Sequence, residues 1–258
     1  MNHIDSGIYA VALMLAMLLM LELGRRLAIR RMAADPSGAR EGLTALEGAV
    51  FGLMGLLVAF SFSGAATRFD QRRQLVVQEA NDIGTAYLRV SLLPEAAQPA
   101  MRDYFRRYLD LRMIAYRRAS SNLAEALAAH QESTHIQGKM WSLAIEATRD
   151  NSSPQTTILL LPALNQMFDT STTQFMAAKI HPPWIIFIML VVLALASSLL
   201  AGYDMPGGKR RSWIHTVSFA GIMAISVYVI LDLEFPRLGL IRIDDVDQAL
   251  LQVRDGMK

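Results

Sequence analysis

The stretch that decides the fold is Ala45–Arg73, ALEGAVFGLMGLLVAFSFSGAATRFDQRR. It is apolar enough to lie in a bilayer, yet it contains Glu47, four glycines and two serines. It then runs into charged sequence with no proline and no turn signal. We therefore expect a helix that spans the membrane and continues past it as a rigid rod, because ATRFDQRRQLVVQEA contains no helix breaker.

Apolar residues are concentrated in long runs along the chain. They make up 53% of the 258 residues, and charged residues make up 19%. A hydrocarbon core is crossed by about 20 helical residues. The segments long enough to do so are Gly7–Gly24, Leu43–Ala66, Trp184–Tyr203 and Trp213–Leu231. We interpret the first as a retained span and not a signal peptide, because no Lys or Arg precedes it.

The region between the second and third spans has the pattern of amphipathic helices. Its first stripe follows steps of four and three residues: Val76, Ala80, Ile83, Tyr87 and Val90. We expect three charged residues on the same helix, Glu79, Asp82 and Arg89, to pair with the arginines of the next one. We predict an all-α membrane protein with four transmembrane helices and an extramembrane four-helix bundle inserted between spans two and three. The expected domains are residues 1–66 (spans one and two with a basic loop), 67–181 (the bundle), 182–232 (spans three and four) and 233–258 (a C-terminal tail).

Three blocks of the sequence resemble the bacterial bestrophin-like domain family of membrane proteins. They are Glu47–Glu95, which begins EGAVFGLMGLLVAFSFSG, Leu164–Asp169 (LNQMFD) and Leu231–Asp244 (LDLEFPRLGLIRID). The family is named for kinship to bestrophins, which are oligomeric anion channels with four spans per subunit and a large helical domain. The resemblance therefore implies an anion channel of that architecture.

One face of the second span is built mainly from small residues. Its members recur at steps of four and three: Gly48, Gly52, Gly55, Ala59 and Phe62. Small residues let helix backbones approach closely, which predicts tight helix packing. The same face also fits a water-filled path, with Phe60 or Phe62 as a gate that dewets. Both interpretations stay open, and they are compatible if the helices pack around an axis.

Charged residues border this span at both ends. Glu47 lies about one turn inside its start, where an acidic group is costly and indicates a functional role unless it reaches the interface or pairs with Arg40. Arg68, Arg72 and Arg73 form a basic collar where the helix leaves the membrane. In an oligomer this collar would concentrate anions around the axis. The alternative for the collar is anchoring to lipid phosphates.

The sequence carries no signature of catalysis. It lacks cysteine, a metal-ligand spacing among its five histidines, a glycine-rich phosphate loop and the H-E-x-x-H and G-x-S-x-G motifs. We expect no enzyme activity, no cofactor and no metal, and the net charge of +2 does not indicate nucleic acid. The expected function is an anion-preferring, homo-oligomeric ion channel with span two lining the axis; its partners are the lipid bilayer, other copies and small ions. The alternative is a non-conducting scaffold or sensor whose helical bundle binds a partner.

The basic residues of the two short loops predict the orientation in the membrane. They are Arg25, Arg26, Arg30, Arg31 and Arg40 after the first span, and Lys209, Arg210 and Arg211 before the fourth. Short basic loops stay in the cytoplasm. We therefore expect a protein of the bacterial inner membrane whose bundle and both termini lie outside the cytoplasm, which is the reverse of the bestrophin arrangement.

Overall fold

The computed structural model describes residues 3–34, 43–149, 154–205, 213–236, 240–241, 243 and 247–257. Within these ranges every regular element is a helix and no strand occurs, which confirms the all-α class. Four helices are long and apolar enough to cross a membrane: Ser6–Arg31, Ala45–Leu92, Trp184–Asp204 and Trp213–Glu234. The chain divides into two compact units, Met1–Arg68 with His181–Leu240 (unit 1) and Phe69–Ile180 with Ile241–Lys258 (unit 2).

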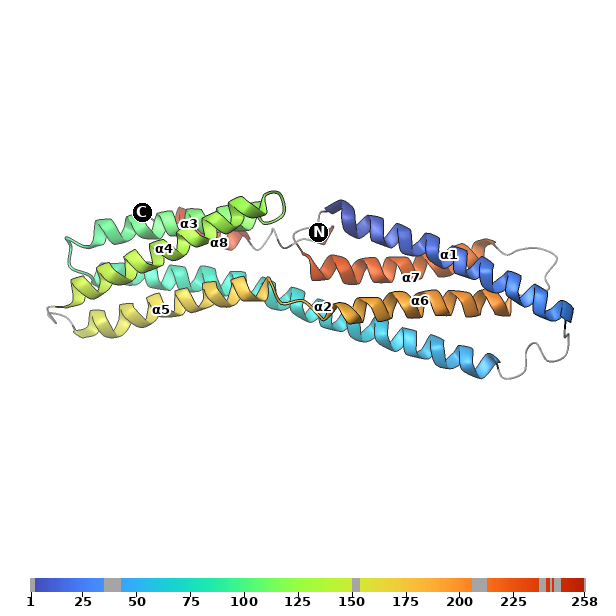
Figure 1. Cartoon of the computed structure of the whole chain (residues 1–258). Coiled ribbons are helices and arrows are strands. Elements are labelled where there is room, and N and C mark those ends of the chain that lie inside the picture. The colour runs from blue at the N-terminus through green and yellow to red at the C-terminus, as the bar shows by residue number, and fades with distance from the viewer. Residues whose placement is uncertain are drawn as a thin grey trace. The chain divides into compact units, whose positions relative to one another are not determined.

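Unit 1 is a bundle of apolar helices (Figure 1). It consists of α1 (His3–Ala34), the first part of α2 (Leu43–Leu88), α6 (Trp184–Asp204) and α7 (Trp213–Glu234). Its core contains Leu13, Met17, Leu21, Met54, Leu190, Ala194, Ala220 and Val227. Large apolar side chains such as Leu19 and Ile222 are exposed on the outside. A helix that is apolar all round is typical of a membrane span, so unit 1 has the surface of a bundle embedded in lipid.

α1 and α6 approach each other so closely that glycine is required at their crossing. A Cβ on Gly24 would overlap the carbonyl oxygen of Leu199, and a Cβ on Gly202 would overlap that of Leu21. Ser198, one turn before Gly202, is fully buried. This is the small-residue packing that brings helices together in lipid. This crossing lies between α1 and α6 and does not involve the small residues of the second span.

Unit 2 is a second helical bundle with its own core (Figure 1). It contains the rest of α2, η1 (Arg89–Leu92), α3 (Gln98–Arg118), α4 (Leu123–Thr148), α5 (Pro154–Ala177) and α8 (Gln248–Asp255). The predicted stripe, which runs from α2 into η1, is buried throughout: Val76, Ala80, Ile83, Tyr87 and Val90. It packs in one cluster with Phe105 of α3, Ile136 of α4 and Leu164 of α5.

The C-terminal helix α8 belongs to unit 2. Leu250 is fully buried in the core of that unit. Arg254 forms an ion pair with Asp110 of α3, with 2.7 Å between Nε and Oδ1. Leu250 and Val253 lie one turn apart and share a face, so this short amphipathic helix, within the predicted C-terminal segment 233–258, packs on the bundle.

The helices of unit 2 begin at recognisable signals. Pro99 lies in the first turn of α3, where its missing N–H is not needed. The Asn122 side chain caps α4 by accepting a hydrogen bond from the backbone N–H of Glu125 at 3.2 Å. α5 begins at Pro154, and proline is favoured at the first position of a helix.

Candidate functional site

The outward face of α2 in unit 1 carries the small residues singled out from the sequence. Gly48, Gly52 and Gly55 are exposed, and beyond the helix itself no described atom comes within 4 Å of where their Cβ atoms would lie. Ala59 is also exposed on this face. Within the single chain, this part of α2 therefore presents bare backbone to its surroundings.

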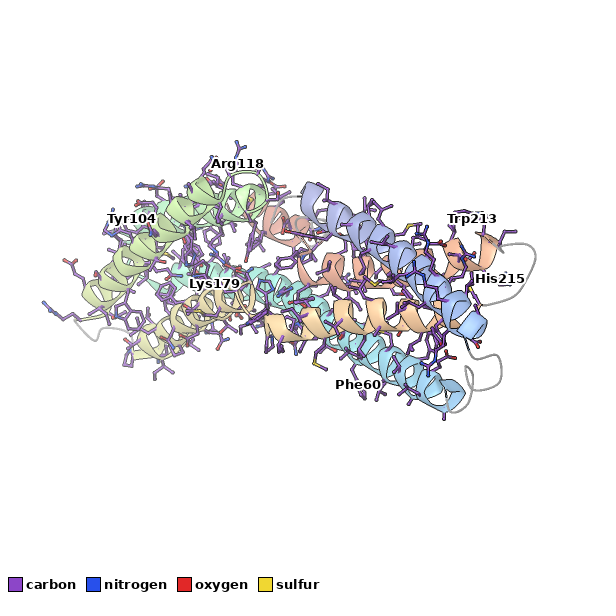
Figure 2. The ribbon with its side chains drawn as sticks, turned by 45° about the vertical axis from the view of Figure 1, so that its right-hand side comes forward. Phe60, Tyr104, Arg118, Lys179, Trp213 and His215 are labelled. Carbon is purple, nitrogen blue, oxygen red and sulfur yellow. The ribbon has the colours of Figure 1, made fainter. Side chains whose placement is uncertain are left out.

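Two phenylalanines border the same face. Phe60 is 67% exposed and Phe62 is 46% exposed, and Figure 2 shows Phe60 on the outer edge of α2. Phe51, by contrast, packs edge-on against Phe219 of α7, with 6.0 Å between ring centroids. Bulky residues thus attach α2 to unit 1, whereas the two phenylalanines predicted as a gate project away from the unit's core.

Glu47 lies near the start of α2 and is almost completely buried. It is 9% exposed, and its Oε1 atom has no hydrogen-bond partner in the part of the chain that the structure describes. Arg40, the partner considered from the sequence, lies outside that part. A buried polar atom is destabilising unless it has a hydrogen-bond partner, and the described side chains do not supply one to Glu47 Oε1.

Arg68 of the basic collar has a structural partner in unit 1. Its Nη2 lies 2.8 Å from Oε2 of Glu234, the last residue of α7, whose side chain is fully buried. The Oε1 atom of Glu234 lies 3.0 Å from Nδ1 of His181. The His181 ring in turn packs on Phe235, with 4.6 Å between ring centroids. Arg68 therefore compensates a buried carboxylate that would otherwise be very costly.

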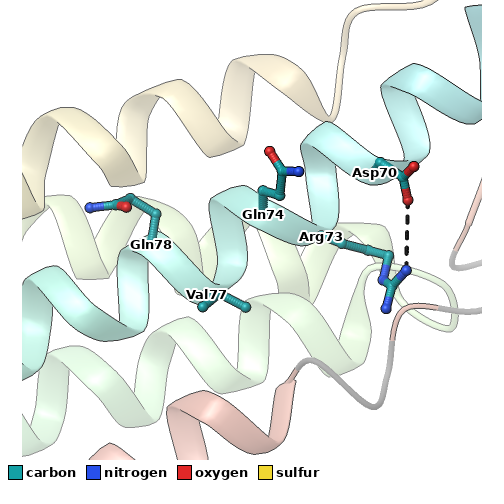
Figure 3. A pocket seen from close by; sticks show the side chains of 5 residues that line it. All are labelled: Asp70, Arg73, Gln74, Val77 and Gln78. Atoms are coloured by element: carbon teal, nitrogen blue, oxygen red, sulfur yellow. Dashed lines mark ion pairs between the residues drawn. The ribbon is translucent and has the colours of Figure 1, made fainter.

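Arg72 and Arg73 lie in unit 2 and have different surroundings. Arg72 is buried and donates hydrogen bonds to the backbone oxygens of Ala177 at 3.1 Å and Ile180 at 2.8 Å. It thereby satisfies carbonyl groups at the C-terminal end of α5. Arg73 is exposed, with its Nη1 3.6 Å from Oδ1 of Asp70. Figure 3 shows the open hollow on α2 that Arg73 lines with Asp70, Gln74, Val77 and Gln78.

A buried ionic cluster joins α2, α3 and α5 in unit 2. Arg112 of α3 is 1% exposed and donates two hydrogen bonds to Glu79 of α2, from Nε to Oε1 at 2.6 Å and from Nη2 to Oε2 at 3.1 Å. Its Nη2 also donates to Tyr116 Oη at 3.0 Å and to Gln174 Oε1 of α5 at 3.1 Å. Tyr116 donates a further hydrogen bond to Glu79. The predicted pairing with an arginine of the next helix is confirmed for Glu79. Asp82 instead accepts a hydrogen bond from Thr170 of α5 at 2.6 Å, and Arg89 donates one to the Leu159 backbone oxygen of α5 at 2.6 Å.

The electrostatics of this cluster keep the Arg112 guanidinium charged and the Tyr108 phenol neutral. Burial alone would lower the pKa of Arg112, but its interactions with Tyr116, Glu79 and Tyr108 raise it well above the ordinary value. Burial, with the negative charge of Glu79, raises the pKa of Tyr108 to about 12. The cluster therefore holds a permanent cation bound by one carboxylate.

The sequence contains a signal for this cluster. Arg112 falls within the apolar stripe of α3, at helical spacing from Phe105, Tyr108 and Tyr116. A charged residue at a core position requires a buried partner. The contribution of Gln174 was not predicted, because it lies on a separate helix.

A comparison with models of protein families matches residues 10–247 to the Bestrophin-like domain. The chain belongs to the bestrophin-like family. This confirms the resemblance found in the three sequence blocks. Neither the curated proteins nor the solved structures give a match. Family membership and the four long apolar helices together describe a multi-pass membrane protein.

Gly202→Ala should destabilise this bestrophin-like protein by about 1–3 kcal/mol, the usual cost of overpacking a well-packed core. The reason is that a Cβ on Gly202 overlaps the Leu21 carbonyl oxygen, so α6 must move away from α1. Thermal unfolding of the purified protein in detergent measures the loss. Gly221→Ala on α7 is the matched control, because a Cβ there meets nothing within 4 Å. The control should be neutral or slightly stabilising, since alanine is the better helix former; equal losses in both variants would contradict the described crossing.

Proposed function

We propose that this bestrophin-like protein is an oligomeric channel for small ions in which α2 of each copy lines the central axis. The observation that supports the proposal is the open face formed by Gly48, Gly52 and Gly55. Each glycine inside a helix costs about 1 kcal/mol relative to alanine. Helix packing among the described residues does not account for them, since the tight crossing uses Gly24 and Gly202. Close contact with α2 helices of other copies would explain why glycine stands at these exposed positions.

A ring of α2 helices would place small residues and backbone around a water-filled path. Small residues allow the helices to approach closely. Phe60 and Phe62 are large and exposed. In such a ring they would narrow the path directly after the segment of small residues that ends at Ala59. Hydrophobic constrictions of this kind gate channels by excluding water.

We assign the anion preference mainly to Arg73. Arg68 pairs with Glu234, and Arg72 binds backbone oxygens at the end of α5. Arg73 is exposed on α2 and has the weaker, 3.6 Å pairing with Asp70. Repeated around an axis, its charge would raise the local concentration of anions.

Unit 2 is an extramembrane helical bundle in this proposal. Its support is the surface of α3, where Asp103, Arg107 and Arg117 are exposed, because charged side chains facing lipid would be very costly. We place the protein in the bacterial inner membrane, with lipids, further copies of itself and small ions as its partners. We propose no catalytic activity, cofactor or nucleic acid.

One observation favours the second candidate, a non-conducting scaffold or sensor. Leu88 is 76% exposed and Ile158 is 69% exposed in unit 2. Arg89 donates a hydrogen bond to the Leu159 backbone oxygen at 2.6 Å, which brings the end of α2 next to the start of α5. The two apolar side chains would suit the docking of a partner protein.

Purified protein in planar bilayers should give ion currents, and Phe62→Ala should increase the unitary conductance by roughly a factor of two, because it widens a hydrophobic constriction. Leu19→Ala is the control, since Leu19 is exposed on α1 and should leave the currents unchanged. Mass photometry of the same sample should report an oligomer. Reproducible absence of current from folded protein, or a monomeric mass, would favour the scaffold.

The positive-inside rule supports a second proposal, that unit 2 and both termini lie outside the cytoplasm. A reporter active only in the periplasm, fused after Lys258, should be active, and a reporter active only in the cytoplasm should be silent at the same position. The reverse result would assign this protein the bestrophin orientation.

A further inference from the structure

His130 of α4 completes the surroundings of the buried guanidinium in unit 2. Its Nδ1 atom lies 3.0 Å from Nη1 of Arg112. A guanidinium group is a hydrogen-bond donor at every nitrogen and never an acceptor. Nδ1 must therefore accept the hydrogen bond, which requires a neutral imidazole with its proton on Nε2.

The rest of the His130 environment also disfavours a positive charge. The ring stacks on Phe175, with 3.8 Å between ring centroids, and Lys179 Nζ lies 4.0 Å from the centroid of the same phenyl ring. The charged and titratable groups that face His130 from the packed helices are Glu79 of α2, Arg112 and Tyr116 of α3, and Lys179 directly after α5. Arg112 and Lys179 therefore disfavour a positive charge on the partly buried His130 ring, whereas Glu79 favours it.

The pKa of His130 responds to these surroundings in one direction. Burial lowers it from the ordinary value of 6.5, and the charges of Arg112 and Lys179 lower it further, against an opposing contribution from Glu79. The unfolded chain has no such constraint. As the pH falls through the ordinary value, the unfolded chain takes up a proton that the folded unit resists, so stability is lost on the acid side.

We propose that His130 is a proton-binding site that loosens unit 2 when the pH falls. Protonation puts a hydrogen on Nδ1, which removes the acceptor for Arg112 and places a second cation beside it. The guanidinium must then shift from its position, and its two hydrogen bonds to Glu79 weaken with it. Since Glu79 lies on α2, acid weakens the attachment of α2 to α3 and α4.

The proposal goes beyond ion conduction and does not depend on it, because its consequence is a change in the packing of unit 2. His135 provides an internal comparison. It lies on the same helix as His130 and is exposed. A response that belongs to the buried cluster should therefore be carried by His130 and not by His135.

The test is hydrogen exchange of the full chain in detergent at about pH 7.5 and about pH 5.5, corrected for intrinsic exchange rates. Protection of α3, α4 and α5 should fall on acidification by at most roughly tenfold, the limit set by an unfolded chain whose histidine titrates at the ordinary value, while α1 and α7 should change little. His130→Asn keeps an acceptor for Arg112 but cannot become a cation, so it should abolish most of the acid response. His135→Asn should retain it. An undiminished response in His130→Asn would overturn the proposal.

A second measurement keeps the test decisive if His130→Asn does not fold. Histidine-selective NMR of the wild-type protein follows each of the five rings through its titration. Single replacements of His3, His135, His181 and His215 by Asn assign four signals, and the remaining signal belongs to His130. The His130 signal should titrate below pH 6.5, the ordinary value. A midpoint at or above that value would overturn the proposal.

Discussion

The contact of α1 with α6 at Gly24 and Gly202 is the constraint on which the arrangement of unit 1 depends. Lipid is as apolar as leucine, so helices in a membrane associate through close packing and not through a hydrophobic driving force. α1 and α6 bring backbone against backbone at this crossing. α2 is attached to the unit differently, through larger side chains such as Phe51. Its glycine face consequently remains on the outside, where only another protein surface would give close packing.

Buried charges constrain the side chains that surround them in both units. Arg112 in unit 2 and Glu234 in unit 1 are both fully enclosed and need complete sets of partners. Removing one member of a buried ion pair costs about 3–5 kcal/mol, because the other charge is left uncompensated. The collar of arginines is therefore largely structural: Arg68 is committed to Glu234, and Arg72 to the end of α5. Any attraction of ions by this collar depends mainly on Arg73.

Features that depend on local periodicity could be predicted from the sequence. The four spans follow from runs of apolar residues, and the buried stripe from Val76 to Val90 follows from helical spacing. The small-residue face of α2 was also visible as spacing, but its exposure was not. Whether a glycine packs or stays open depends on helices far away in the sequence, and Gly24 and Gly202 show no local pattern that distinguishes them from Gly52. The partners of His130 and Arg72 could not be predicted either. His130 contacts Arg112 of another helix, and Arg72 binds backbone oxygens at the end of α5.

In the proposed channel, the glycine face of α2 contacts α2 of another copy. The chain contains no cysteine, so a single introduced thiol reports on its own position. Ala59→Cys, oxidised in native membranes, should give a covalent dimer on a non-reducing gel. Leu19→Cys, exposed on α1, should remain monomeric under the same conditions. A monomer from Ala59→Cys together with a dimer from Leu19→Cys would contradict the claim and place the contact between copies on α1.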